Sequence, residues 1–193
     1  MAISIHTWRV TGISPLLQNN PAGTMDAGDG SGMSSGKKKY VDQDEAEMRV
    51  YRNERGEIIH PTAAFRSGML EASKGRKIGK TSARVVVAGA VLPCEPEVII
   101  TDAKGKPITK YEIHKCRVMV GKNGVLRCRP MYRDWHADLA LEVDDDFIGD
   151  ADLVTDLLNI AGRTVGIGDF RPDTSKGKGG IGTFGRYRVE LKQ

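Results

Sequence analysis

The sequence predicts an α+β protein, and the order of its hydrophobic patterns supports this class. Alternation of apolar and polar residues, typical of strands, occurs at 3–10, 111–120, 134–143 and 183–191. Apolar residues at helical spacing occur at 61–74 and 150–161. In chain order these elements give βαββαβ, the pattern of the ferredoxin-like (RRM-like) fold. We expect such a core with large loop and β-hairpin insertions.

Local signals justify each element in turn. In the first strand, Ile3 and Ile5 face one way while Trp8 and Val10 face the other. Pro61 suits the first turn of a helix that ends near Gly75. A valine-rich run at 83–92 predicts a further strand, and 98–101 a short one. The second helix begins at Asp150 or Asp152, which are suitable N-cap residues.

Turn and loop signals divide the chain further. Asn123-Gly124 is a hairpin signal that joins 111–120 to 125–132. We expect a single domain over residues 1–193 with three inserted regions. They are a flexible loop at 18–45, a β-rich insertion and hairpin at 78–133, and a glycine-rich loop region at 163–183.

The composition excludes a membrane span and favours a reduced, cytoplasmic protein. The chain has 193 residues, and no apolar run in it approaches the roughly 20 residues that a membrane helix requires. Its N-terminal segment lacks the apolar region of a signal peptide. Three cysteines, none in a C-x-x-C pair, do not suggest a disulfide framework.

Charge is distributed unevenly along the chain. The net charge is +4, but residues 144–156 carry aspartates and no base, whereas cations cluster at 37–39, 66–84, 110–133 and the C-terminal segment. Glycines at 177, 179, 180 and 182 alternate with lysines near the C-terminus. Bare backbone beside cations suits a phosphodiester chain, so the pattern indicates a nucleic-acid partner.

Three local features resemble the RAMP superfamily (repeat-associated mysterious proteins), in particular the backbone subunits of CRISPR effector complexes. The first is the segment GEIIHPTAAFRSG at 56–68, which resembles the family's entry to its first helix. The second is the glycine-rich loop leading into Gly182-Thr183-Phe184-Gly185-Arg186, and the third is the long insertion after the first strand. The family usually has Gly-Ser-Ser where this chain has Thr62-Ala63-Ala64, which removes hydroxyl donors.

The resemblance implies a non-enzymatic, sequence-independent protein that binds single-stranded RNA, as a guide RNA, and self-associates along it as a filament or multi-subunit complex. Other CRISPR subunits are further expected partners, and no cofactor is expected. The helix start at Pro61 is expected to bind phosphate. The expected nucleic-acid-binding residues are Lys37, Lys38, Lys39, Arg66, Arg76, Lys77, Lys80, Lys176, Lys178 and Arg186.

Two other functions stay open at this point. In RNA-cleaving subunits of the family a catalytic aspartate lies in the loop after the first strand, where this chain has Asp26 and Asp29. The resemblance therefore also allows a metal-dependent endoribonuclease, with Asp26 as a weak catalytic candidate. The four histidines show no metal-ligand spacing. A viral or mobile-element mimic that inhibits a CRISPR complex is the third possibility.

Aromatic residues make up only 6% of the chain, which favours contact with the nucleic-acid backbone over base stacking. The candidates for stacking are Trp8, Tyr40, Tyr132, Trp135, Phe184 and Tyr187.

Overall fold

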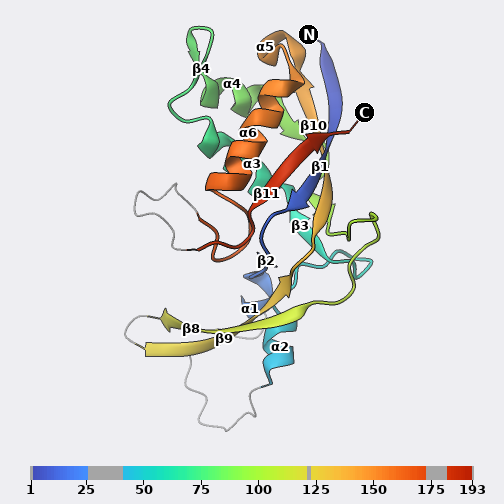
Figure 1. Cartoon of the computed structure of the whole chain (residues 1–193), viewed down its shortest axis with the longest axis vertical. Helices are drawn as coiled ribbons and strands as arrows, with labels where there is room; N and C mark the ends of the chain where they lie inside the picture. Colours follow the sequence, from blue (N-terminus) through green and yellow to red (C-terminus); the bar gives the residue numbers. More distant parts are fainter. Residues whose placement is uncertain (1, 26–40, 121–122, 173–181, 193) are drawn as a thin grey trace.

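A computed structural model describes residues 2–25, 41–120, 123–172 and 182–192 and shows a mixed α+β chain with antiparallel sheets (Figure 1). The predicted α+β class is confirmed. The largest sheet has the strand order β11-β1-β10-β6, with every neighbouring pair antiparallel. Its strands are β1 (Ile3–Gly12), β6 (Val91–Pro93), β10 (His136–Asp144) and β11 (Tyr187–Leu191).

One face of this sheet forms the core. Trp8 and Val10 of β1 are fully buried, whereas Ile3 and Ile5 on the opposite face are exposed, as the alternation predicted. Helices α3 (Thr62–Ala72) and α6 (Ala151–Thr164) pack on each other and cover the buried face (Figure 1). A Cβ on Gly162 of α6 would lie 2.1 Å from the Tyr187 carbonyl oxygen, so a glycine there permits close helix–strand contact.

A second sheet extends away from the first. It has the order β2-β9-β8, with β2 (Leu16–Leu17), β8 (Glu112–Val120) and β9 (Asn123–Tyr132), and the predicted hairpin between its two long strands is confirmed. The chain passes between the sheets twice, from β1 into β2 and from β9 into β10 (Figure 1). The remaining elements are α1 (Ala22–Met25), α2 (Asp42–Glu47), β3 (Ile59–Pro61), β4 (Lys77–Ile78), β5 (Thr81–Ser82), α4 (Ala83–Ala90), β7 (Glu97–Ile99) and α5 (Asp145–Ile148).

The prediction that 111–120 is the second strand of the main sheet was wrong. This segment is β8, and the short β6 takes the place beside β10 instead. Alternate residues of the β8–β9 hairpin are charged on both faces, with Lys115 and Arg117 on one and Arg127 and Arg129 on the other. A two-stranded ribbon with charges on both faces cannot be buried under helices, so its two strands pair with each other and β8 does not join the main sheet.

The predicted strand at 83–92 was also wrong over most of its length, because residues 83–90 form α4. Ala83, Val87 and Ala90 lie one helical turn apart and are buried, whereas Val85 is 66% exposed. Tertiary burial at helical spacing therefore overrides the strand propensity of consecutive valines. As a result, residues 78–133 are not one β-rich insertion, since they contain α4 and the core strand β6.

The other two expected insertions are described only in part. Of the region 18–45, the structure includes α1 and the start of α2, while 26–40 lies outside the described residues. Of the region 163–183, residues 163–172 and 182–183 are described, and α6 reaches Thr164.

The outer edge of β11 is occupied by a side chain. The Asn159 carboxamide accepts from the Val189 amide at 2.8 Å and donates to the Val189 carbonyl at 3.2 Å. It thus satisfies both backbone groups that Val189 presents at the open edge of the sheet. This protects the edge from pairing with another strand at that residue.

The buried Tyr187 hydroxyl gives a test of core packing. Its oxygen has no hydrogen-bond partner among the described residues, and burial raises the pKa of the phenol. We expect Tyr187→Phe to raise the free energy of unfolding by about 1 kcal/mol, because an unsatisfied buried hydroxyl is removed at nearly constant shape. Chemical denaturation followed by circular dichroism measures the change.

Tyr132→Phe is the matched control. Its hydroxyl donates to Gln18 Oε1 at 3.3 Å, so its removal should lower the stability. A loss of stability in Tyr187→Phe equal to that of the control would contradict an unsatisfied hydroxyl at Tyr187.

Candidate nucleic-acid interface

A short cationic hairpin projects between α3 and α4. Gly75, with φ +73°, follows the end of α3, and Gly79, with φ +58°, lies in the turn between β4 and β5. Arg76, Lys77 and Lys80 on this segment are all exposed. We call these three residues the basic hairpin. Figure 1 shows β4, the strand that begins at Lys77, at the edge of the molecule beside α4.

The cations of the basic hairpin differ from the cations on either side of them in whether they form ion pairs. Lys74 and Arg84 both pair with Glu71, at 2.6 Å and 3.8 Å. The side chains of Arg76, Lys77 and Lys80 have no ion pair among the described residues. The hairpin therefore presents three positive charges to solvent without an ion-pair partner in the described part of the chain.

Arg66 lies near this surface but its guanidinium is used inside the fold. Its Nη2 donates to the Ala88 carbonyl at 2.7 Å and its Nε to the Val91 carbonyl at 3.5 Å. These carbonyls belong to the C-terminal end of α4, where a cation also interacts favourably with the helix dipole. Arg66 thus stabilises the helix that follows the basic hairpin.

The start of α3, expected to bind phosphate, already has partners within the protein. The Thr62 amide donates to the Pro96 carbonyl at 3.0 Å, and its hydroxyl donates to the Glu95 carbonyl at 2.7 Å. Thr62 is buried, and the segment that contains its partners Glu95 and Pro96 continues with Glu97, which pairs with Pro61. Neighbouring carboxylates disfavour a further anion at this end of the helix.

The base of the glycine-rich loop is held firmly. We call residues 169–172 and 182–186 the stem. The Asp169 amide donates to the Leu17 carbonyl at 2.9 Å, and the Phe184 amide donates to the Phe170 carbonyl at 3.1 Å. A Cβ on Gly182 would lie 1.8 Å from the Phe170 carbonyl oxygen, so only glycine fits there.

Arg186 of the stem is a partly buried residue whose backbone is fixed. Its amide donates to Ser14 Oγ at 3.0 Å, and its carbonyl accepts from the Ile13 amide at 2.8 Å. Its Nε is buried without a hydrogen-bond partner among the described residues. The remaining expected contacts, Lys37, Lys38, Lys39, Lys176 and Lys178, lie outside the described residues, as do Asp26, Asp29 and Tyr40.

Four of the six candidates for stacking lie in the core. Trp8, Tyr132, Trp135 and Tyr187 are at most 2% exposed and belong to the core. The indole N–H of Trp8 donates to Thr155 Oγ1, and that of Trp135 donates to the Ser14 carbonyl. These rings cannot stack on a nucleobase, because core packing covers their faces.

A cluster of aromatic and charged residues lies at the stem, and of these the sequence had singled out only Phe184, as a candidate for stacking. Arg129 of β9 pairs with Asp169 at 2.5 Å, and its guanidinium lies 4.8 Å from the centre of the Phe170 ring. His114 of β8 meets Phe184 edge to face, with ring centroids 5.2 Å apart. Burial and the nearby Arg129 lower the pKa of His114 below its ordinary value.

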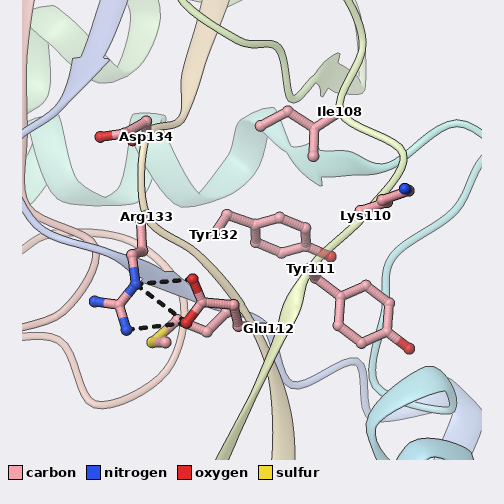
Figure 2. Close-up of a pocket in the computed structure, with 8 residues that line it drawn as sticks. Ile108, Lys110, Tyr111, Glu112, Tyr132, Arg133 and Asp134 are labelled. Carbon is pink, nitrogen blue, oxygen red and sulfur yellow. Dashed lines mark hydrogen bonds and ion pairs between the residues drawn. The ribbon is translucent and has the colours of Figure 1, made fainter.

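A pocket of about 220 Å³ lies at the base of β8 and β9. Figure 2 shows the Arg133 guanidinium bound to the Glu112 carboxylate on one side of it, at 2.8 and 2.9 Å. The Tyr111 hydroxyl donates to Glu47 Oε2 at 2.5 Å. These polar groups are therefore paired within the protein rather than presented to a ligand. The lining residues are Ile108, Lys110, Tyr111, Glu112, Met131, Tyr132, Arg133 and Asp134.

A serine, a histidine and an aspartate meet at the other end of the main sheet. Ser4 Oγ donates to Asp145 Oδ1 at 2.8 Å and accepts from His6 Nε2 at 2.8 Å. In a hydrolase triad the histidine takes the serine proton, and the aspartate binds the histidine. Here the carboxylate binds the serine, so the arrangement fixes the N-terminal strand rather than activating a nucleophile.

The aspartates of 144–156 act at helix starts. The Asp144 and Asp150 carboxylates accept from the amides of Asp146 and Asp152, at 3.1 and 2.9 Å, and so cap α5 and α6. The predicted cap at Asp150 is confirmed. Within the described ranges no group of three or more His, Cys, Asp or Glu side chains is placed to hold a metal ion.

Comparisons with known proteins give no assignment. No protein-family model matches the chain, and no curated protein matches it in sequence. In the part of the chain that the structure describes, no helix is both long enough and apolar enough to cross a membrane.

His60 gives a test of pH dependence. The side chain is fully buried, and burial, reinforced by Arg171, lowers its pKa to about 4 from an ordinary value of 6.5. Between these values the unfolded chain binds a proton that the folded protein does not bind. The stability should therefore be fully present above pH 6.5 and fall as the pH drops towards 4, by up to about 3 kcal/mol.

Urea denaturation between pH 4 and 7.5 measures this slope in the wild type and in His60→Leu. His114 and His136 also have lowered pKa values and contribute in the same direction, so the comparison with the variant isolates His60. The same slope in both proteins would show that His60 does not determine the acid lability.

Proposed function

We propose that the protein binds single-stranded RNA through its sugar–phosphate backbone, without sequence preference. The observation that carries this proposal is the basic hairpin, whose Arg76, Lys77 and Lys80 are exposed and without ion pairs among the described residues. Desolvating charges that already have partners is costly, so unpaired cations are those best placed to bind phosphates. The exposed hydroxyl side chains of Thr81 and Ser82 lie on the same hairpin and add donors.

We also propose that the main sheet with α3 and α6 is a ferredoxin-like core. Along the chain the relevant elements are β1, α3, β6, β10, α6 and β11. Their sheet order, with the last strand beside the first and the third beside the second, supports this topology. The RAMP resemblance of residues 56–68 and 182–186 then suggests a backbone subunit of a CRISPR-type ribonucleoprotein.

The open face of the main sheet does not favour the RNA-binding mode of an RRM. That mode uses aromatic side chains on the sheet to stack bases. In this protein the corresponding face carries Ile3 and Ile5, and an ion-pair group in which Asp138 binds Arg9 at 3.2 Å and Lys192 at 2.9 Å. Contact with phosphates at the edge of the molecule is the mode that these residues support.

The test is a salt titration of a triple variant, Arg76→Ala with Lys77→Ala and Lys80→Ala. We expect the wild type to bind labelled oligouridine with an affinity that falls steeply with salt, because phosphate binding releases counterions. Loss of three phosphate contacts should lower the slope of log K against log salt by about 2 and weaken binding at low salt about tenfold or more. Fluorescence anisotropy gives both quantities.

The matched control removes three exposed cations elsewhere, with Arg55→Ala, Lys104→Ala and Lys106→Ala. It changes the net charge equally, so it should keep most of the slope if binding is local to the basic hairpin. An affinity that is flat with salt, or an equal loss in both triple variants, would contradict the proposal.

Self-association along the RNA is a separate expectation of the proposed backbone role. Acidic residues lie at the starts of α5 and α6 and cations on the basic hairpin, an asymmetry that suits head-to-tail contacts between copies. We expect the complex mass measured by sedimentation to grow with RNA length from 20 to 60 nucleotides, roughly in steps of one subunit. A single 1:1 complex on every length would exclude this arrangement.

A further inference from the structure

The stem brings two aromatic rings from distant parts of the chain together near the surface. Phe184 precedes β11, and His114 lies on β8, yet their rings meet edge to face at 5.2 Å and an interplanar angle of 67°. Both residues are half-buried, unlike the core aromatics, so each keeps part of its ring accessible. His114 Nδ1 is buried without a hydrogen-bond partner among the described residues.

Arg129 lies directly opposite His114 in the β8–β9 pairing. It is 8% exposed, pairs with Asp169, and donates to Cys116 Sγ at 3.3 Å. Its guanidinium also lies over Phe170, a non-glycine residue with φ +50°. Backbone strain of this kind persists only where the surroundings enforce it. Arg129 is thus a positioning residue, because its donors bind Asp169 and Cys116.

We propose that the exposed parts of the His114 and Phe184 rings stack on a nucleobase of the strand whose phosphates contact the basic hairpin, an inference that rests on the proposed function. Stacking on aromatic rings tolerates every base, which agrees with binding that has no sequence preference. Cations lie near both rings, because Arg129 is opposite His114 in the β8–β9 pairing and Arg186 follows Phe184 by two residues. The most exposed phenylalanine, Phe147 at 61%, lies instead on α5 beside Asp145 and Asp146, where a polyanion is repelled.

The test compares oligouridine with an abasic sugar–phosphate strand of the same length. We expect the wild type to bind oligouridine about tenfold more tightly than the abasic strand, because only the former can stack. Phe184→Leu and, separately, His114→Gln should reduce this ratio towards one while keeping the salt dependence. Phe147→Leu, the control, should leave the ratio unchanged.

A second measurement uses the unaltered protein, so it does not depend on the folding of a variant. Photocrosslinking with 4-thiouridine RNA, followed by mass spectrometry, should place crosslinks on the peptides that carry His114 or Phe184. Crosslinks confined to other peptides, or equal affinity of the wild type for the two strands, would overturn the proposal.

The two proposals fail in different ways. If neither strand binds in a salt-dependent manner, the proposed function fails and the base contact fails with it. If both strands bind equally and with the same steep salt dependence, phosphate binding stands and the base contact alone is excluded.

Discussion

The buried carboxamide of Gln18 is the interaction that holds the second sheet against the strand preceding α3. Its Nε2 donates to the Ile59 carbonyl at 2.7 Å, and its Oε1 accepts from the Tyr51 amide at 3.0 Å and the Tyr132 hydroxyl at 3.3 Å. One side chain therefore joins β2, β9 and β3, the strand that leads directly into α3. Because Gln18 is fully buried, any rearrangement that separates these segments leaves polar groups unsatisfied in the interior. The position of α3, and of the basic hairpin that follows it, depends on this contact.

The hydrogen-bond and ion-pair partners that the fold supplies also determine which cations remain available to a ligand. Arg49 pairs with the buried Glu45 at 2.9 Å, Arg66 binds carbonyls at the end of α4, and Arg129 pairs with Asp169. Each of these arginines meets an acceptor that the fold places within its reach, and a guanidinium so bound would lose those bonds in order to bind phosphate. The basic hairpin follows Gly75 and turns at Gly79, with no acidic residue between Gly75 and Ser82. Its charges are free because the local sequence supplies no partner for them.

Whether a residue's partners lie close in sequence or far away also determines how much of the structure could be predicted from the sequence. Elements with strong local signals were predicted well, including the alternating strand at Ile3–Gly12, the capped helix after Asp150 and the β8–β9 hairpin. The cations of the basic hairpin are close in sequence, so their clustering was visible there, while their contact with nucleic acid stays a prediction. The role of Arg66 was not predicted, since its acceptors lie 22 and 25 residues away. The valines at 85–87 were assigned to a strand because only tertiary burial shows that Val87 faces the core and Val85 does not. The pairing of His114 with Phe184 joins residues 70 positions apart, and no spacing rule predicts such a contact.

The distribution of aromatics and charges together constrains how a nucleic acid would lie on the surface. Core packing occupies Trp8, Tyr132, Trp135 and Tyr187, so the described part of the chain keeps few rings for bases. The acidic starts of α5 and α6 disfavour a polyanion near the top of the main sheet, and paired charges occupy its open face. The cationic turn after α3 and the aromatic pair at the stem are two surfaces, from separate parts of the chain, that these features leave available. A strand that contacts both would be bound mainly by its phosphates, with base contact confined to one place. Such binding is largely indifferent to sequence, because every nucleotide presents the same phosphate and every base has a face that can stack.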